Sequence, residues 1–251
     1  MGQVFFVGAG PGSADLITLR GAGLLARADV VLFDALTDPA LRELAPQAQW
    51  IDVGKRGFAH ATRQAAINAL LLRMARQHAL VVRLKGGDPS LFGRLEEELE
   101  ALAASGIGCE VVPGVTAALA AAAAAKRPLT RRGRGRSVAF STAMTHGGEV
   151  RASRCADSEV FYMAGRQLGA LARRLRAAGW PADAPVCVVS RAGWSDQLVS
   201  QHRVDTLVQA TVLHAGRPTV VTVGAAAEGP GPTAKTLSAD RQPTGEIAAS
   251  N

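Results

Sequence analysis

The chain has 251 residues, of which 48% are hydrophobic, 20% charged and 4% aromatic, and its formal net charge is +7. This composition excludes a chain that is disordered throughout, and the length allows one large domain or two smaller ones. The longest weakly apolar run covers residues 115–125, whereas a membrane-spanning helix needs about 20 apolar residues, so we expect no membrane span.

The first half of the chain predicts short apolar strands that alternate with helices. We expect strands over residues 3–7, 30–33, 49–53, 80–84 and 109–112. The expected helices cover 16–28, 39–45, 62–78 and 95–105, with Ser13 or Asp15 capping the first. Because the strands are continuously apolar rather than alternating, the pattern favours a parallel sheet with helices on both faces.

Pro113-Gly114 is the expected domain boundary, which gives an N-terminal α/β domain over 1–114 and a C-terminal α/β domain over 115–225. The second domain is predicted to start with an alanine-rich helix over 116–125. Strands over 137–141, 159–163, 186–190 and 219–223 follow, with helices over 168–178 and 204–207. Residues 226–251 are small and polar, and we expect a disordered tail there.

The three cysteines predict no chemistry. Cys109, Cys155 and Cys187 are far apart, with no paired spacing and no histidine cluster nearby, so we expect reduced thiols and no metal site. No cationic segment precedes the apolar residues near the N-terminus, which argues against a secretory signal. We therefore expect a cytoplasmic protein.

Most of the net charge is concentrated in one segment, residues 126–136 (KRPLTRRGRGR), which carries +6 and leaves +1 for the rest of the chain. Arginine clusters suit partners that bear several carboxylates or phosphates. The segment contains no aromatic residue, which makes it a poor stacking platform for single-stranded nucleic acid. A small polyanionic substrate, a nucleic acid and a merely solvated loop all remain open at this point.

The turns after the first four strands carry the candidate site residues. In an open α/β sheet, ligands bind beyond the carboxyl ends of the strands. Pro11, Asp34 and Lys55 follow the first three strands, and Gly86-Gly87-Asp88 follows the fourth. Glycines there let the backbone approach a ligand. Asp88 is either a ligand contact or a helix cap, and Asp34 with Lys55 is either a catalytic pair or a structural ion pair.

The first turn, GAGPG, is not a dinucleotide-binding fingerprint. The G-x-G-x-x-G pattern requires glycine where this chain has Ser13, and Pro11 lacks an amide hydrogen to donate to a phosphate. A nicotinamide dinucleotide site is therefore disfavoured.

Taken together, the motifs resemble those of the uroporphyrinogen-III C-methyltransferases, within the tetrapyrrole methylase superfamily. The resemblance rests on GAGPG, LFDAL, VGKRG, VVRLKGGDPSLFGR and EVVPGVTAALAAAAAAKRPLTRR, followed in order by FYMAG, VCVVSRAGWSDQ and GRPTVVTVG. It covers about residues 4–224. It implies two α/β domains with a cofactor cleft between them, and a homodimer that binds neither nucleic acid nor membrane.

The resemblance also implies residue roles. S-adenosylmethionine, converted to S-adenosylhomocysteine, would bind at Pro11, Gly86, Gly87, Asp88, Leu91, Thr116, Ala117, Met163 and Ala192. Asp34 would accept a proton, Lys55 would donate one, and no metal is implied. The implied reaction is C-methylation of uroporphyrinogen III to precorrin-2, for sirohaem or cobalamin. The basic segment would dock the carboxylates of the substrate, so that reversing the charges of Arg131 and Arg132 would weaken substrate binding more than cofactor binding.

The chain departs from the family pattern at several positions. Ala35 stands where arginine is usual, Leu95-Glu96 replaces paired glycines, Met144 ends a segment where a T-G-H motif is common, and Ala164 follows Met163 where glycine is usual. The alternatives are therefore a later precorrin C-methyltransferase of the same superfamily, an RNA-binding or RNA-methylating protein, and a non-catalytic binding module.

Overall fold

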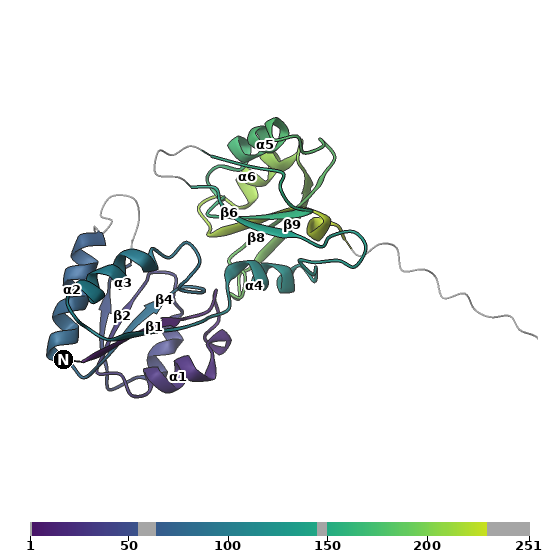
Figure 1. Cartoon of the computed structure of the whole chain (residues 1–251). Helices are drawn as coiled ribbons and strands as arrows, with labels where there is room; N and C mark the ends of the chain where they lie inside the picture. Colours follow the sequence, from purple (N-terminus) through teal and green to yellow (C-terminus); the bar gives the residue numbers. More distant parts are fainter. Residues whose placement is uncertain (1, 55–63, 145–149, 230–251) are drawn as a thin grey trace, which may run out of the picture.

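The structure is a computed structural model, and it describes residues 2–54, 64–144 and 150–229 (Figure 1). The N-terminal sheet contains β1 (Gln3–Gly8), β2 (Val30–Phe33), β3 (Gln49–Asp52), β4 (Leu80–Lys85) and β5 (Cys109–Val112). All its pairings are parallel, and the strand order is β3-β2-β4-β1-β5. The turns after β1 and β4 therefore lie side by side.

Helical segments cover both faces of this sheet, as the apolar strands predict. Helix α1 (Leu19–Leu25) and the 3-10 helix η2 (Pro39–Leu44) pack on one face, where Leu25 and Leu41 meet Phe5. Helices α2 (Gln64–Gln77) and α3 (Leu95–Ala104) pack on the other, where Leu71 and Leu102 meet Phe6. The core of this domain is thus split into two apolar layers by the sheet.

The C-terminal sheet is mixed. It contains β6 (Val138–Thr142), β7 (Ser158–Tyr162), β8 (Pro185–Ser190), β9 (Leu198–Arg203) and β10 (Thr219–Gly224), in the order β6-β7-β10-β8-β9. Strands β6 and β7 are parallel, and the other pairs are antiparallel. Helix α5 (Leu168–Ala177) and the short helices η3 (Leu207–Gln209) and α6 (Ala210–Leu213) cover one face.

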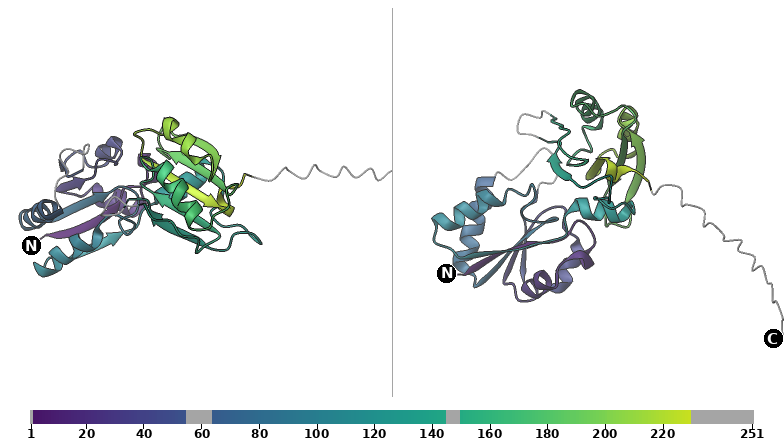
Figure 2. Two further views of the ribbon diagram at one scale, coloured as in Figure 1. Left: turned by 90° about the horizontal axis from the view of Figure 1, so that it is seen from above. Right: turned by 45° about the vertical axis from the view of Figure 1, so that its right-hand side comes forward.

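The other face is covered by α4 (Ala117–Ala124) and by η4 (Ala225–Ala227). The alanine-rich sequence explains the close fit of α4, because its short side chains let the helix backbone approach the sheet. Ala118 and Ala121 are buried against Val160, Cys187 and Val220. Figures 1 and 2 show α4 on the side of the second sheet that faces the N-terminal domain.

The structure corrects the expected first helix. Instead of one helix over 16–28 there are a 3-10 turn, η1 (Ala14–Leu16), and then α1. The chain is extended at Ile17 and Thr18, and the Thr18 hydroxyl caps α1 by accepting from the Gly21 amide at 3.1 Å. The expected cap residue Ser13 instead donates its hydroxyl to Asp15.

Three further corrections concern the second domain and the turn before β3. Strand β9 was not expected, because its alternately exposed residues, LVSQHR, lack the apolar run that marks the central strands. The expected helix over 204–207 is a turn, and helix begins only at Leu207. The segment expected as a helix over 39–45 is the 3-10 helix η2, capped by Asp38.

The last described residues differ from the expected tail. Ala226 and Ala227 belong to η4 and are buried. The start expected for the helix over 62–78 falls partly outside the described residues, as does the tail from residue 230 onward. Within the part of the chain that the structure describes, no helix is both long enough and apolar enough to cross a membrane.

Candidate functional site

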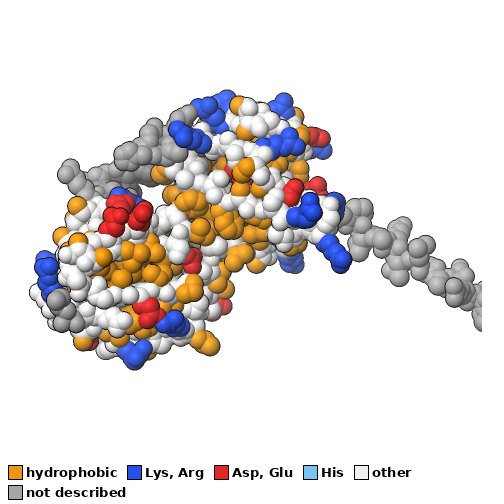
Figure 3. All heavy atoms as spheres, in the orientation of Figure 1, with side chains coloured by type: hydrophobic (Ala, Val, Ile, Leu, Met, Phe, Trp, Pro, Cys, Tyr) orange, Lys and Arg blue, Asp and Glu red, His pale blue; other side chains and the backbone are white. Residues whose placement is uncertain are grey.

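A cavity lies where the two domains meet. On the N-terminal side it is bounded by the turns after β1 and β4, and on the C-terminal side by the ends of β7 and β8 and by the start of β10. Its wall is mainly apolar, and Figure 3 shows hydrophobic side chains gathered along the junction of the two lobes. A cavity at the carboxyl ends of parallel strands is where an open α/β sheet binds its ligand.

The two N-terminal turns are joined backbone to backbone. The Gly87 amide donates to the Gly10 carbonyl at 2.7 Å, and the Gly10 amide donates to the Gly87 carbonyl at 3.3 Å. Gly87 has a φ of +72°, a conformation that residues with a side chain rarely adopt. A Cβ on Gly86 would meet only the Leu36 Cβ, at 3.5 Å, so both glycines leave open space beside the strand ends.

The residues predicted to bind a cofactor all line this cavity. From the N-terminal domain these are Pro11, Gly86, Gly87, Asp88 and Leu91, and from the start of α4 they are Thr116 and Ala117. Met163 and Ala192 complete the set from the C-terminal domain. The fold thus brings together nine residues that are spread over most of the sequence. That they hold a cofactor stays a prediction.

Asp88 has a role that neither sequence interpretation anticipated. Its Oδ1 accepts from the Ser90 amide at 2.8 Å, and its Oδ2 accepts from the Gly114 amide at 2.9 Å. The carboxylate therefore ties the β4 turn to the connection between the domains. It does not cap α3, whose N-cap residue is Arg94.

Asp34 lies beside the cavity rather than in its wall. It follows β2, and Leu36, two residues later, does line the cavity. The side chain of Asp34 is about one-third exposed, and its Oδ1 accepts from Nη2 of Arg83 at 2.7 Å. Lys55, predicted as its partner, lies outside the described residues. The partner that the structure gives to Asp34 is therefore an arginine of β4.

Several cavity residues escaped the sequence interpretation. Tyr162 is the only tyrosine of the chain, and its hydroxyl bonds to the Thr116 hydroxyl at 2.7 Å and accepts from the Ala118 amide at 3.3 Å. Burial raises the pKa of this phenol. Phe92, Arg191 and Trp194 also line the cavity. These residues lie in the segments FYMAG, SLFGR and SRAGW, which carry part of the family resemblance, and that resemblance is the signal that could have found them.

Backbone strain is concentrated at the cavity. Among the described residues, five other than glycine have a positive φ: Phe92, Arg94, Lys126, Met163 and Arg191. Phe92, Met163 and Arg191 line the cavity, and Arg94 lies two residues from Phe92. Such conformations cost about 1 kcal/mol or more each and persist only where the surrounding structure imposes them. Their position marks this region as a functional site.

A direct contact between the domains lies at the edge of the cavity. The Ser13 amide donates to the Gly193 carbonyl at 3.0 Å. Gly12 packs against the same loop, and a Cβ there would come within 2.7 Å of the Ala192 carbonyl oxygen. The glycine-rich turn after β1 therefore also joins the two domains.

A buried polar network supports the C-terminal wall. His214 is fully buried, with its Nδ1 2.9 Å from the Ser190 hydroxyl and its Nε2 2.8 Å from the Ser200 hydroxyl. Arg217 donates to the Ser190 hydroxyl at 2.9 Å. Ser190 directly precedes Arg191 and Ala192, so the network fixes the strand end that faces the cavity.

The buried imidazole predicts a dependence of stability on pH. Burial, with the charges of His202 and Arg217, lowers the pKa of His214 to about 4. In the unfolded chain the ordinary value is about 6.5, so the unfolded state binds more protons between these values. The free energy of unfolding should therefore fall by about 2–3 kcal/mol as the pH decreases from 6.5 to 4. Above pH 6.5 the contribution of neutral His214 to stability is fully present. Urea denaturation across this range measures it.

The matched control replaces a different histidine. His214→Gln should remove most of the slope, and the smaller remainder comes from His202, whose pKa burial also lowers. His78→Gln, directly after α2 in the other domain, should keep the slope. An unchanged slope in His214→Gln would contradict the assignment.

The basic segment is placed away from the cavity. Arg127 and Arg131 donate to carbonyl groups of Ala227 and Glu228, and Arg134 pairs with the Glu228 carboxylate. No residue from 126 to 136 lines the cavity. The side chains of Arg127, Arg131 and Arg134 thus contact the end of the C-terminal domain, and docking of the substrate by this segment stays a prediction.

Fold and cavity together define a class: two-domain α/β proteins that hold a small molecule between their domains. The sequence profile of the Tetrapyrrole (Corrin/Porphyrin) Methylases matches residues 3–208. The chain belongs to this family.

Named relatives agree with that assignment. The chain is 40% identical over 237 residues to a uroporphyrinogen-III C-methyltransferase from Synechocystis, covering 90% of this chain and 89% of the relative. It is also 43% identical over 231 residues to a siroheme synthase from Ectopseudomonas mendocina. That match covers 89% of this chain but only 50% of the longer relative. The crystal structure of uroporphyrin-III C-methyl transferase from Thermus thermophilus, complexed with S-adenyl homocysteine, superposes with a TM-score of 0.80 at 36% identity, covering 90% of this chain and 98% of that one.

Proposed function

We propose that this protein is an S-adenosylmethionine-dependent uroporphyrinogen-III C-methyltransferase that forms precorrin-2. The observation that carries the proposal is the cavity between the domains, whose wall contains the nine residues that match the family's cofactor motif. A relative with similar length and fold has been crystallised with S-adenyl homocysteine, and the Synechocystis relative carries the same activity in its name. The product would feed sirohaem or cobalamin synthesis.

The residues present fit the proposed cofactor. The paired glycines after β4 leave a cradle that side chains would fill, and they expose backbone groups to an adenosyl ligand. The mainly apolar wall suits the adenine ring and the methylene groups of the cofactor, and the N-terminal glycine turn supplies further backbone groups. When bound, S-adenosylmethionine supplies an electrophilic methyl group.

The chain's own residues would then position the acceptor and remove a proton. Attack by an electron-rich pyrrole carbon leaves the methylated ring with one proton in excess, which a base must accept. Asp34 is the carboxylate beside the cavity and is proposed as that proton acceptor, with Lys55 as donor. Holding nucleophile and methyl group in line contributes up to about 7–11 kcal/mol of the barrier reduction.

Calorimetry with S-adenosylhomocysteine and transfer of a labelled methyl group to uroporphyrinogen III test the proposal. We expect both binding and label transfer by the wild-type chain. Gly86→Val should weaken S-adenosylhomocysteine binding at least tenfold, because the side chain enters the open space beside β4. Gly108→Val is the matched control, since a Cβ there meets nothing within 4 Å.

The possible outcomes separate the alternatives. Cofactor binding with label transfer only to a later corrin intermediate would favour another precorrin methyltransferase. Salt-sensitive binding of RNA with no tetrapyrrole turnover would favour an RNA-binding or RNA-methylating protein. Absence of any heat with S-adenosylhomocysteine would overturn the proposal altogether.

The remaining features of the proposal concern organisation. We propose that the two domains divide at residue 114, that the protein acts as a homodimer in the cytoplasm, and that it binds a tetrapyrrole rather than nucleic acid. Analytical ultracentrifugation of the purified chain measures the oligomeric state.

A further inference from the structure

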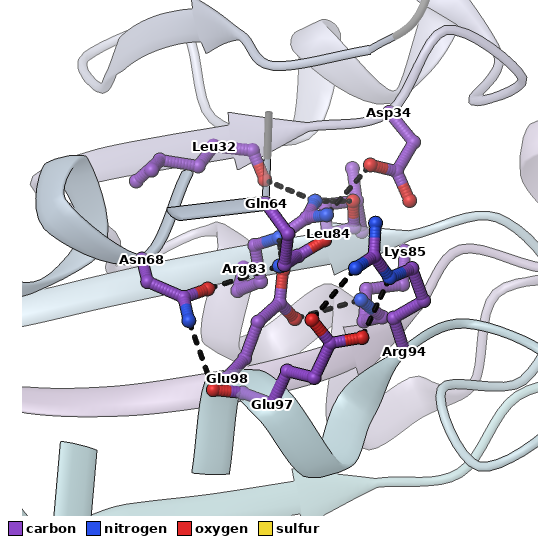
Figure 4. A network of polar contacts seen from close by, with 10 residues as sticks. All are labelled: Leu32, Asp34, Gln64, Asn68, Arg83, Leu84, Lys85, Arg94, Glu97 and Glu98. Carbon is purple, nitrogen blue, oxygen red and sulfur yellow. Dashed lines mark hydrogen bonds and ion pairs between the residues drawn. The ribbon is translucent and has the colours of Figure 1, made fainter. Parts of the chain in front are cut away.

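A cluster of four charged side chains lies beneath the cavity, inside the N-terminal domain. Arg83 and Lys85 come from β4, Glu98 from α3, and Asp34 from the end of β2, as Figure 4 shows. The side chains of Arg83, Lys85 and Glu98 are each at most 3% exposed, whereas that of Asp34 is 32% exposed. The cluster thus has three buried members, Arg83, Lys85 and Glu98, and one partly exposed carboxylate, that of Asp34.

Arg83 connects the buried part to Asp34. Its Nε donates to Oε1 of Glu98 at 3.0 Å, and its Nη2 donates to Oδ1 of Asp34 at 2.7 Å. Its Nη1 donates to the carbonyl oxygens of Leu84 at 3.1 Å and Leu32 at 3.4 Å. Each of the three guanidinium nitrogens therefore has an acceptor, and the group is held in one orientation.

Glu98 is held as firmly as Arg83. Lys85 donates to its Oε2 at 2.7 Å, and Gln64 from α2 donates to its Oε1 at 3.3 Å. With Arg83 and Lys85 protonated and both carboxylates ionised, the cluster is neutral. Burial opposes the charge on Arg83, but Asp34 and Glu98 outweigh it and raise the pKa of the guanidinium. Burial lowers the pKa of Lys85.

We propose that Arg83 is a positioning residue for the methyl-transfer reaction: anchored by Glu98, it holds one oxygen of Asp34 so that the other is presented to the substrate. The inference rests on the proposed function. Among the described residues, Arg83 bonds Asp34 directly, the charge of Lys85 interacts with that of Asp34, and Glu98 of α3 pairs with both cations.

The pH profile of kcat distinguishes this role from a merely structural one. Arg83→Met removes a positive charge next to Asp34, so the acidic limb of the profile should move up by about one pH unit and kcat should fall at least tenfold. Glu98→Gln removes the competing carboxylate and commits Arg83 to Asp34, so the limb should move down. A structural defect would not shift the limb in opposite directions.

Two further variants keep the test decisive if Arg83→Met does not fold. Arg83→Lys keeps the charge but loses the bidentate fork, so it should restore the position of the limb while kcat stays reduced. Lys85→Met combined with Glu98→Gln removes a neutral pair and should therefore move the limb less than Glu98→Gln alone. Arg20→Met, which breaks an exposed pair with Glu110, is the matched control and should change neither quantity.

The affinity for S-adenosylhomocysteine is the second readout and should change less than threefold in all these variants, because none of the four charged residues lines the cavity. An acidic limb that stays unmoved in Glu98→Gln, that moves in Arg83→Lys as far as in Arg83→Met, or that moves the same way in Arg83→Met and Glu98→Gln would overturn the inference alone. Absence of methyl transfer by the wild-type chain would overturn the proposed function, and this inference with it.

Discussion

Asp34→Asn should lower kcat for methyl transfer by about 100- to 10,000-fold, the range that a general base contributes. Asparagine has nearly the same shape and can still accept the hydrogen bond from Arg83, so the loss isolates the ability to take up a proton. The rate is measured as labelled methyl transferred to uroporphyrinogen III at saturating concentrations of both substrates. The effect should appear in kcat, because the proton leaves after the substrates are bound.

Cofactor binding is the control for this variant. Asp34 does not line the cavity, so the dissociation constant for S-adenosylhomocysteine should stay within about threefold of the wild-type value. Asp34→Ala should lose turnover as well. If either variant kept the full rate, Asp34 would not be the proton acceptor, and Lys55 and the remaining cleft residues would have to be examined for that role.

Gly114→Ala should reduce the free energy of unfolding by about 3 kcal/mol, the upper part of the usual range for overpacking. A Cβ at this position would come within 2.4 Å of the Gly87 carbonyl oxygen and 2.8 Å of the Gly8 Cα. These are backbone atoms, so no flexible side chain can move aside. The turns after β1 and β4 would have to separate, which also weakens cofactor binding. Urea denaturation and calorimetry measure the two effects.

Gly23→Ala is the matched control. Gly23 lies within α1, and a Cβ there would meet nothing within 4 Å. Alanine should therefore stabilise the helix by about 0.5–1 kcal/mol. Similar losses of stability in both variants would mean that the close packing at Gly114 is not the cause.

The strands of the N-terminal sheet could be predicted to within a residue because the three central strands, β1, β2 and β4, are short and mostly apolar runs. Parallel strands buried on both faces leave this pattern, and turns rich in glycine mark their ends. The position of the cavity followed from the same turns, since the carboxyl ends of parallel strands gather at one edge of the sheet. Local sequence was therefore sufficient for this part of the site.

The buried charge cluster was missed for a physical reason. Glu98 lies in the sequence LEEELE, where neighbouring glutamates make each one resemble a solvated surface residue. Arg83 gave the clearer signal, because a charged residue inside the apolar strand LVVRLK must find a partner in the interior. That partner is 15 residues away and comes from a different element, so the sequence alone could not identify it.

The role of the basic segment stays a prediction for a related reason. Charge density in a sequence shows that a segment favours anions, but it does not show which part of the fold lies nearby. Here Arg127, Arg131 and Arg134 bind carbonyl groups and a carboxylate around residues 227–229, about 100 residues later. Strand β9 was missed because edge strands need no continuous apolar pattern.

The left-handed residues around the cavity also limit how this protein can be improved by engineering. Replacing Met163 or Arg191 with glycine would relax the local backbone, so a search for thermostable variants would tend to select such changes. The same changes would remove side chains from the cavity wall and let the ends of β7 and β8 move. At these positions thermostability and turnover should therefore be traded against each other, and heat-resistant variants are better sought in α1 or on the outer faces of α2 and α5.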